Sequence, residues 1–286
     1  MILVTGGTGF VGRHIVARLV SAGEKVRVLA RSRAETPGAE MVAGDIRDLS
    51  AVVRAARECE AVIHLVGIIR ERGDATFQRM HVDATRTVIQ ACQEAGVPRL
   101  LHMSALGARP GAKSGYHRTK WEAEELVRVS GLPATIFRPS VIFGPGGGFV
   151  AELRRLVHGG PVIPIIGDGM ALLQPIWVED IASCFARAIN KPEASGKAYE
   201  LGGPETFGFE PLIDLIAEAE GISKPKLHLP VALVRPVAAT LGRLFSRFPI
   251  TSDQLTMLLE DSVCDITGMQ ETFGVRPASL RDHMRE

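Results

Sequence analysis

The sequence predicts a doubly wound α/β fold, in which a parallel sheet carries helices on both faces. Two observations favour this fold class. Short apolar runs alternate with helix-like patterns through the first two-thirds of the 286 residues. In addition, a glycine-rich turn joins the first apolar run to the first helix pattern.

The opening turn is the strongest local signal. Ile2–Val4 is typical of a buried strand, and a helix pattern from about Phe10 to Val20 follows Gly6, Gly9 and Gly12. In a dinucleotide-binding turn, such glycines permit a tight reversal, close approach of a pyrophosphate and close packing of helix on sheet. The helix N-terminus then offers N–H groups to the phosphates. We therefore expect a Rossmann-type cofactor site, the alternative being an ordinary glycine-rich turn.

The remaining elements follow in alternation. Strands are expected at Lys25–Ala30, Met41–Ala43, Ala61–Val66, Arg99–Met103 and Ala134–Phe137, and helices at Leu49–Arg57, Thr76–Ala95 and Thr119–Val129. After Pro139 the regular alternation ends, and a glycine-rich loop follows. Beyond it, helices are expected at Glu179–Asn190 and Pro211–Glu220, and a short extended piece at Ala198–Leu201. This indicates an NAD(P)-binding domain over residues 1–140. A smaller substrate or partner lobe is expected over 141–286, with some elements returning to the main sheet.

Composition excludes several classes of protein. The formal net charge of +1 does not indicate binding to nucleic acid or to an anionic membrane. The four cysteines form no CxxC pair, which favours free thiols in a reducing compartment. No run of 18 apolar residues occurs, and the N-terminus is at once a strand, so neither a membrane span nor a signal peptide is expected. A cytoplasmic protein is predicted.

The end of the second strand bears on the choice of cofactor. Arg31 and Arg33 follow it, where an acidic residue would select NAD. Because a guanidinium can hold a 2′-phosphate through two bonds, we expect a preference for NADP(H), with NAD(H) as the alternative. These arginines are otherwise only solvated loop charges. Asp45, after the third strand, is placed to accept from the adenine amino group or, alternatively, to cap the next helix.

Tyr116 and Lys120 form the candidate catalytic pair. Their i, i+4 spacing places them on one helix face. A phenol is a poor acid or base near neutral pH, and a neighbouring ammonium would lower its pKa. Hydride transfer needs such a group, because a carbonyl oxygen must receive a proton while its carbon receives hydride.

These motifs resemble the short-chain dehydrogenase/reductase superfamily, in its extended, epimerase-like branch. The matching segments are Thr5–Gly12, Gly44-Asp45, Tyr116 with Lys120, Arg138-Pro139 with Ile142–Pro145, and Val178–Asp180. Three further segments resemble the atypical subgroup that includes the NADPH-binding accessory subunit of respiratory complex I. These are His102–Gly107, Gln174–Ile181 and Thr251–Asp261.

The resemblance implies roles for individual residues. Lys120 would bridge the nicotinamide ribose hydroxyls and tune Tyr116 as proton relay, with Ser104 as a third catalytic candidate. The implied cofactor-binding set is Gly6, Thr8, Gly9, Phe10, Val11, Gly12, Arg31, Arg33, Asp45, Ile46, Val66, Gly67, Met103, Lys120, Pro139, Val141 and Ile142.

Two positions depart from the family pattern. His81 stands where the extended branch has Asn. Ala105 stands at the expected catalytic hydroxyl, with Ser104 one residue earlier. Adjacent strand residues face opposite sides, so Ser104 reaches the site only if the strand bends there. His64 and His102 lie in apolar runs, so they are expected to be core residues, and no metal site is expected.

The segment 229–248 is apolar, carries Arg235, Arg243 and Arg247, and is expected to be interrupted by Pro236. It is either a helix packed on the core or a surface for a protein partner or the inner face of a membrane.

Two functions remain open. The first is an NADP(H)-dependent oxidoreductase acting on a small carbonyl or alcohol, quinone-like or nucleotide-sugar substrate. The second is a non-catalytic NADPH-binding accessory or assembly protein of a respiratory or quinone-synthesis complex.

Overall fold

The structure, a computed structural model, describes residues 1–32, 36–244 and 250–284, with only the backbone described for 239–244. The chain forms two compact units. The first comprises Met1–Pro139, Val178–Leu201 and Asp265–Arg276. The second comprises Ser140–Trp177, Gly202–Cys264 and Pro277–Glu286. The chain therefore re-enters the first unit twice after leaving it at Pro139.

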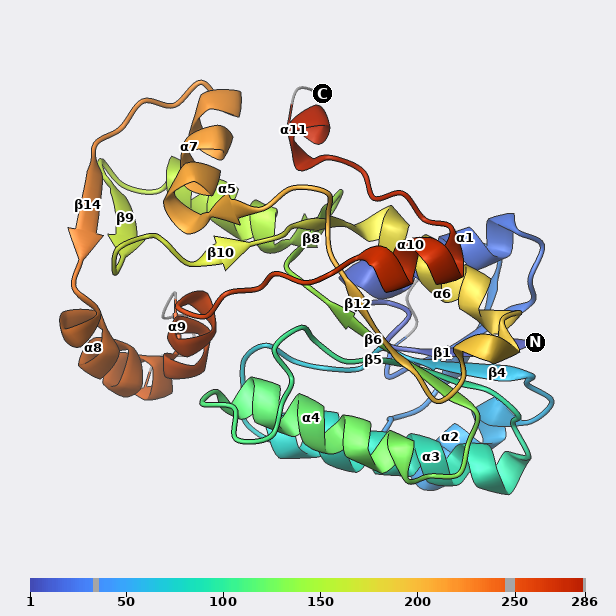
Figure 1. The fold of residues 1–286 in the computed structure, drawn as a ribbon. Helices are drawn as coiled ribbons and strands as arrows, with labels where there is room; N and C mark the ends of the chain where they lie inside the picture. The colour runs from blue at the N-terminus through green and yellow to red at the C-terminus, as the bar shows by residue number, and fades with distance from the viewer. Residues whose placement is uncertain (33–35, 245–249, 285–286) are drawn as a thin grey trace. The chain divides into compact units, whose positions relative to one another are not determined.

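A seven-stranded sheet with all neighbours parallel forms the centre of the first unit (Figure 1). Its order is β12-β6-β5-β4-β1-β2-β3. Because successive strands are added outward on either side of β1 and β4, the sheet is doubly wound, which confirms the predicted fold class. The strands are β1 Ile2–Thr5, β2 Val26–Ala30, β3 Ala39–Ala43, β4 Ala61–His64, β5 Leu100–Met103, β6 Ala134–Pro139 and β12 Ala198–Leu201.

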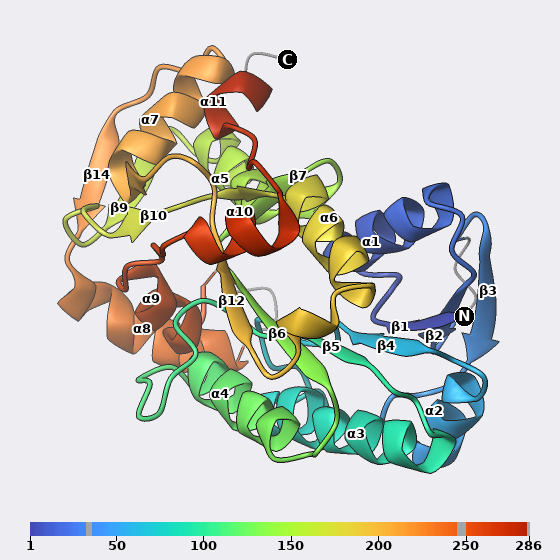
Figure 2. The ribbon, with the colours of Figure 1, turned by 45° about the vertical axis from the view of Figure 1, so that its right-hand side comes forward.

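Helices cover both faces of this sheet (Figures 1 and 2). On one face lie α2 Leu49–Ala56, α3 Ala84–Ala95 and α4 Gly115–Arg128. On the other lie α1 Phe10–Ser21, α6 Val178–Ile189 and α10 Thr267–Phe273, with the short 3-10 helix η2 Pro192–Ala194 after α6. Leu3, Val62 and Leu100 are among the strand residues that pack on the α2–α4 face. The residues next to them along each strand point to the opposite face of the sheet, because successive side chains of a strand alternate between faces.

Two helices differ from expectation. The helix expected over Thr76–Ala95 starts as a π-helix, η1 Gln78–Asp83, before α3 begins. Helix α4 begins at Gly115 rather than near Thr119, because the Ser114 hydroxyl caps it by accepting the His117 N–H at 3.1 Å. Tyr116 therefore lies in the first turn of α4.

The second unit consists of short elements around its own core. Its strands are β7 Ile142–Gly144, β8 Gly147–Gly148, β9 Ile163–Ile166, β10 Leu172–Leu173, β11 Ile176–Trp177, β13 Phe207–Gly208 and β14 Lys226–Leu229. Its helices are α5 Phe149–His158, α7 Phe209–Ala219, α8 Val231–Leu244, α9 Ser252–Leu258 and α11 Leu280–His283. Leu153 of α5 and Leu212 of α7 belong to one buried cluster with Ile165 of β9.

Pro236 does not interrupt the apolar segment, contrary to expectation, and lies inside α8. A proline removes one backbone N–H donor from a helix and does not always end it. The Arg243 side chain and the whole of Arg247 lie outside the described residues. Over the part of the chain that the structure describes, no helix is both long enough and apolar enough to cross a bilayer.

Candidate cofactor and active site

The turn from β1 to α1 has the shape that a pyrophosphate needs. Gly6 has φ +78°, a conformation that favours glycine. A Cβ on Gly12 would lie 2.1 Å from the Gly6 carbonyl oxygen, so only glycine allows this approach. Gly9 is the N-cap residue of α1 and has no side chain to occupy the first N–H groups, and the first turn contains no acidic residue. The turn therefore fits a dinucleotide phosphate held at the helix N-terminus.

The ends of β2 and β3 lie side by side, because the Gly44 N–H donates to the Ala30 carbonyl at 3.0 Å. This brings exposed Arg31 near Asp45, and Ile46 beside them is buried. Arg33 lies outside the described residues. The alternative that Asp45 caps α2 is wrong, since the carboxylate of Asp48 accepts the Ser50 and Ala51 N–H groups there.

The Asp45 carboxylate is already occupied by a neighbour that sequence reasoning missed. Arg47 donates from Nε to Oδ1 at 3.0 Å and from Nη2 to Oδ2 at 2.7 Å, and its N–H donates to Oδ1 at 2.9 Å. These bonds hold the pKa of Asp45 at about 2. Only the spacing of Asp45 and Arg47, an acid and a base two residues apart, hinted at this pairing.

Lys120 is buried at the end of β5, with 2 % of its surface exposed. Its Nζ donates to the Met103 carbonyl at 3.1 Å. Gly67 lies against the same ammonium, because a Cβ there would be 2.8 Å from Nζ. Burial lowers the pKa of Lys120 to about 8, while the nearby Glu124 carboxylate opposes this shift. The structure thus brings Met103, Gly67 and Lys120 together.

Tyr116 lies on the same helix, partly buried, in a small aromatic cluster. Its ring meets those of Phe77, His81 and His117 edge to face at centroid distances of 6.0, 5.3 and 5.4 Å. From the sequence, the Lys120 ammonium was expected to lower the pKa of this phenol. Instead, burial among these rings raises the pKa of Tyr116 to about 12. The phenol is therefore held in its protonated form.

Ser104 directly follows β5. The strand does not bend at Ser104, although a bend there was the condition for Ser104 to reach the site. The Ser104 N–H donates to the Phe137 carbonyl at 2.7 Å, and the Leu106 N–H donates to the Pro139 carbonyl at 2.9 Å. Because this bonding continues the ladder, Ser104 and Ala105 face opposite sides. Ser104 Oγ is buried and, within the described residues, has no hydrogen-bond partner. Ser104 stays a predicted catalytic residue.

His81 connects several parts of this site. Its Nδ1 lies 2.8 Å from Thr119 Oγ1 on α4, and its Nε2 lies 3.1 Å from the Ile68 nitrogen and 3.0 Å from the Ile68 oxygen. It lies in the π-helix, a feature often found at functional sites. Burial and the Lys120 charge lower its pKa to about 2, so the imidazole is neutral. The sequence marked His81 as a departure from the family pattern but predicted none of these contacts.

A hydrogen-bonded row of side chains continues from β1 towards His81. The Thr5 hydroxyl lies 2.8 Å from Nδ1 of His64, whose Nε2 lies 3.2 Å from Thr85 Oγ1. Thr85 donates in turn to the His81 carbonyl at 2.5 Å. His64 and His102 are buried, as expected of core residues. Burial lowers the pKa of both.

The other predicted cofactor residues are divided between the units. Val66 packs at the edge of the α2–α4 core, and Pro139 ends β6 in the first unit. Val141 and Ile142 belong to the second unit. There the Val141 carbonyl accepts the Ile176 N–H at 2.9 Å, and Ile142 pairs with Ile176 in the β7–β11 ladder.

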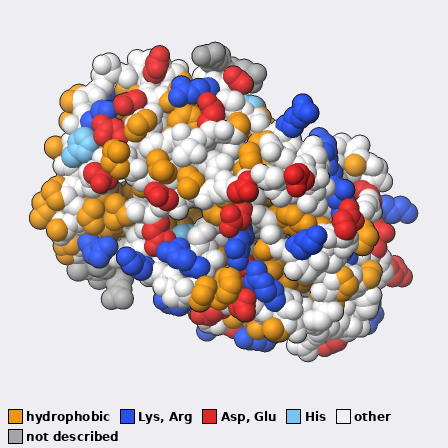
Figure 3. Space-filling model, viewed as in Figure 1, with side chains coloured by type: hydrophobic (Ala, Val, Ile, Leu, Met, Phe, Trp, Pro, Cys, Tyr) orange, Lys and Arg blue, Asp and Glu red, His pale blue; other side chains and the backbone are white. Residues whose placement is uncertain are grey.

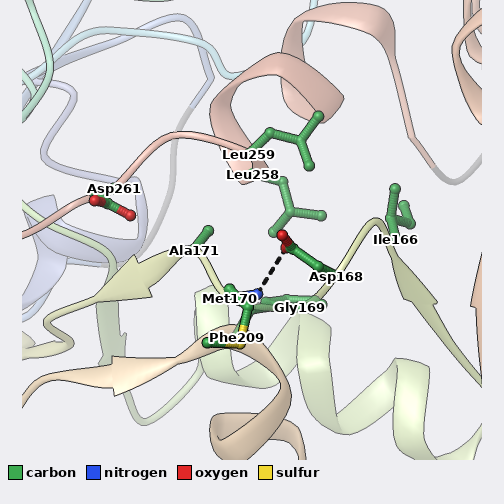
Figure 4. Close-up of a pocket in the computed structure, with 9 residues that line it drawn as sticks. All are labelled: Ile166, Asp168, Gly169, Met170, Ala171, Phe209, Leu258, Leu259 and Asp261. Carbon is green, nitrogen blue, oxygen red and sulfur yellow. Dashed lines mark hydrogen bonds between the residues drawn. The ribbon is translucent and has the colours of Figure 1, made fainter. Parts of the chain in front are cut away.

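The second unit contains a pocket of about 220 Å³ (Figure 4). Its walls include Phe209 and Leu258, and two carboxylates lie at it. Asp168 accepts the Met170 N–H at 3.0 Å and Asp261 accepts the Leu172 N–H at 2.8 Å. Both carboxylates are therefore already engaged, Asp168 within its own turn and Asp261 by a backbone N–H that is distant in the chain, and the pocket contains no predicted site residue.

Comparison with known proteins agrees with this geometry. A profile of the NAD dependent epimerase/dehydratase family matches residues 2–202. The mitochondrial NADH dehydrogenase [ubiquinone] 1 alpha subcomplex subunit 9 of Arabidopsis thaliana is 29% identical over 267 residues, which cover 88% of this chain and 66% of that protein. The ceramide reductase of Caulobacter vibrioides is 35% identical over 188 residues, which cover 64% of this chain and 59% of that protein. The aligned parts thus span less than two-thirds of either relative.

Among solved structures, MoeE5 in complex with UDP-glucose and NAD superposes with a TM-score of 0.79. The match covers 99% of this chain and 95% of that one at 22% identity. At this identity the likeness concerns the fold alone.

Proposed function

This chain belongs to the NAD dependent epimerase/dehydratase family, and from that premise we propose that it is an NADP(H)-dependent oxidoreductase. The substrate would be a small carbonyl compound or the corresponding alcohol, of a quinone-like, lipid-derived or nucleotide-sugar class. The buried Lys120 ammonium carries this proposal. Among the described residues the ammonium has one hydrogen-bond acceptor, the Met103 carbonyl. Burying an ammonium in this way is costly, so it is best explained by a bound group that uses its remaining N–H donors.

Each part of the first unit has a task in this proposal. The Gly6–Gly12 turn and the α1 N-terminus hold the pyrophosphate, and Arg31 holds the 2′-phosphate. Lys120 keeps one N–H on Met103 and directs the others to the nicotinamide ribose hydroxyls. When bound, the nicotinamide donates or accepts hydride. Gly67 leaves the space in front of the ammonium open, because any side chain there would collide with it.

Tyr116 supplies the proton. With a pKa of about 12, its phenol is protonated at neutral pH and is able to donate to a carbonyl oxygen. Reduction is thus the direction that the free protein is prepared for. Positive charge brought in by the oxidised cofactor would lower the pKa of Tyr116 and favour the reverse reaction.

The test combines cofactor turnover with the chain's two tyrosines. NADPH oxidation is followed with panels of quinones, long-chain ketones and nucleotide sugars. Tyr116→Phe should lower turnover on any active compound by roughly 100-fold or more. Tyr199→Phe is the matched control, since Tyr199 is buried on β12 and its hydroxyl has no partner among the described side chains. Equal activity of both variants would refute the role of Tyr116.

The preference for NADP(H) is tested separately by fluorescence titration. Arg31 beside the adenosine site favours the 2′-phosphorylated cofactor. NADH binding as tightly as NADPH would contradict this preference while leaving the oxidoreductase proposal intact.

A second candidate is a non-catalytic NADPH-binding accessory or assembly protein of a respiratory or quinone-synthesis complex. It is favoured by the similarity to a complex I subunit and by apolar side chains exposed on β14 and α8. Leu227, Leu233 and Val237 expose 50%, 67% and 43% of their surface. Figure 3 shows hydrophobic side chains at the left edge, where β14 and α8 lie. Exposed apolar groups of this kind suit a protein partner or a membrane interface.

The accessory-protein candidate predicts a different set of results. NADPH should bind, no panel compound should be turned over, and the protein should float with liposomes or bind membrane-complex preparations through residues 229–248. The location that fits is the cytoplasm, with peripheral attachment to the inner face of a membrane. Turnover that depends on Tyr116, together with no lipid association, would reject it.

A further inference from the structure

The loop between β3 and α2 contains an ion pair, Asp45 and Arg47, that the proposed function does not use. Arg47 folds back over Asp45 through two side-chain bonds and one backbone bond. Both carboxylate oxygens of Asp45 are therefore engaged. An adenine amino group would have to compete with a charge-assisted, two-point interaction for the same oxygens.

This pairing fixes a guanidinium at the place where the cofactor's adenosine end is expected. Arg31 follows the last residue of β2, and Asp45 follows Gly44, which bonds to Ala30 of β2. Arg31 is close enough to act electrostatically on the Asp45 carboxylate. Asp45 thus has Arg47 on its two oxygens and Arg31 within electrostatic reach.

The donor count leaves Arg47 able to bind a further anion. A guanidinium has five N–H donors, and Asp45 accepts from only Nε and Nη2. The remaining donors point away from a carboxylate that already holds the group in one orientation. Asp74 also influences Arg47, but its carboxylate is bonded to Arg79 at 2.8 Å.

We propose that Asp45 is a positioning residue that holds Arg47 as a second guanidinium of the 2′-phosphate pocket, beside Arg31. The inference rests on the proposed use of NADP(H). Two arginines and one aspartate leave a net charge of +1 at this point, which attracts a phosphate. The paired Asp45 repels that phosphate far less than a free carboxylate would. Because Arg47 is held in advance, little side-chain freedom is lost when the phosphate binds.

Two roles of Asp45, contact with adenine and positioning of Arg47, predict different effects of its removal. If Asp45 contacts adenine, its removal weakens NADP and NAD equally, because both contain adenine. If Asp45 positions Arg47, its removal weakens NADP much more than NAD. The pair 2′-AMP and 5′-AMP makes the same distinction without the nicotinamide half.

The experiment is a set of binding titrations on the full-length protein with NADPH, NADH, 2′-AMP and 5′-AMP. Arg47→Gln should weaken NADPH and 2′-AMP by roughly 10- to 100-fold, and NADH and 5′-AMP by less than about twofold. Asp45→Asn should show the same selectivity with a smaller loss. Arg54→Gln is the matched control, because Arg54 is an exposed arginine on α2 that bonds to Ser50 rather than Asp45.

Each outcome has one meaning. Equal losses for both cofactors, or no loss in Arg47→Gln, would overturn the role of Arg47 while NADPH preference in the wild-type protein stands. Tighter binding of NADH by the wild-type protein would overturn the cofactor preference itself and the pocket with it. Arg47 and Asp45 are partly exposed, and matching thermal unfolding curves would show that the variants remain folded.

Discussion

The first unit buries charge and imidazole, whereas the second exposes apolar side chains. In the described part of the chain, the buried charged and imidazole groups all belong to the first unit: His64, His81, Arg99, His102, His117, Lys120 and Glu124. Most of the exposed large apolar residues belong to the second: Met170, Leu172, Leu227, Leu233, Val237 and Val263. Buried ionisable groups cost stability and are typical of chemical sites, while exposed apolar groups are typical of contact surfaces. This difference supports the proposal that the first unit carries the chemistry and the second unit makes external contacts.

Lys120 provides the largest expected effect. Lys120→Met keeps the length of the side chain and removes its charge. We expect cofactor-dependent turnover to fall by roughly 100- to 1,000-fold, because the ribose and proton-relay contacts are lost. Stability should rise at the same time. The folded-state pKa of Lys120 is about 8 against an ordinary 10.5, so burying the ammonium costs on the order of 3 kcal/mol below pH 8.

The measurements are steady-state turnover and urea unfolding at pH 7 and pH 10. In the wild-type protein the cost of Lys120 diminishes as pH rises from 8 to 10.5, because the unfolded state then binds the additional proton. The stability gain of Lys120→Met should shrink over the same range. If Lys120→Met were both active and less stable than the wild-type protein, Lys120 would be neither functional nor costly to bury.

Gly12→Ala tests the phosphate turn. Its Cβ would lie 2.1 Å from the Gly6 oxygen, so the turn must shift. We expect a loss of NADPH binding and a fall in the free energy of unfolding of roughly 1–3 kcal/mol. Gly268→Ala on α10 is the control, since a Cβ there would meet only Tyr199 at 3.6 Å. Urea denaturation and NADPH fluorescence measure both effects, and unchanged cofactor binding in Gly12→Ala would contradict the assigned site.

The buried histidines predict a pH dependence. The folded-state pKa values of His64 and His81 are about 3 and about 2, and that of His102 lies well below its usual 6.5. Because the unfolded chain binds these protons first, protonation has little effect on stability above pH 6.5 and favours unfolding as the pH falls below it. Each imidazole should remove roughly 2 kcal/mol between pH 6.5 and pH 5.

His102→Leu sharpens this test. Both ring nitrogens of His102 are buried and, among the described residues, have no hydrogen-bond partner. The substitution should therefore be neutral or stabilising by about 1 kcal/mol at pH 7, and it should reduce the acid slope by one proton. His81→Leu, which removes contacts to Thr119 and Ile68, should destabilise instead. Urea titrations from pH 8 to pH 5 that show no slope would refute the prediction.

The smallest effect is expected on the exposed face of α8. Leu233→Ser should change stability by less than about 0.5 kcal/mol and leave NADPH affinity unchanged. It should weaken any association with liposomes or a partner protein. Val129→Ser, at a residue of the first unit that is 78% exposed, is the control and should have no effect on association. Equal behaviour of the two variants would remove the distinction between the units' surfaces.

Local patterns predicted local elements well. The apolar run, the glycines and the helix pattern identified β1 and α1, with α1 beginning at Phe10 as expected. Ala198–Leu201 was identified as an extended piece with the same bounds as β12. Such features depend on neighbours within one turn or one strand, so periodicity and glycine placement are sufficient to indicate them. The family resemblance, carried by the same motifs, is confirmed by the profile match.

Contacts between distant residues were decided only by the tertiary structure. β12 pairs with β6 at the sheet edge, although about 60 residues separate them in the chain. The π-helix around His81 and the neutral state of its ring depend on Thr119, Ile68 and Lys120, which come from other elements. The raised pKa of Tyr116 likewise reflects burial, which no sequence spacing reports.

The sequence by itself thus determined the fold class, and it predicted the phosphate turn and the Tyr116–Lys120 pair, because each is encoded in residue types at short spacing. Tertiary structure alone decided that Asp48 rather than Asp45 caps α2, that Arg47 occupies Asp45, and that Lys120 lies against Gly67. Hydrogen-bond partners and burial arise when separate elements pack, and they set the protonation state of His81, Tyr116 and Asp45 in this structure.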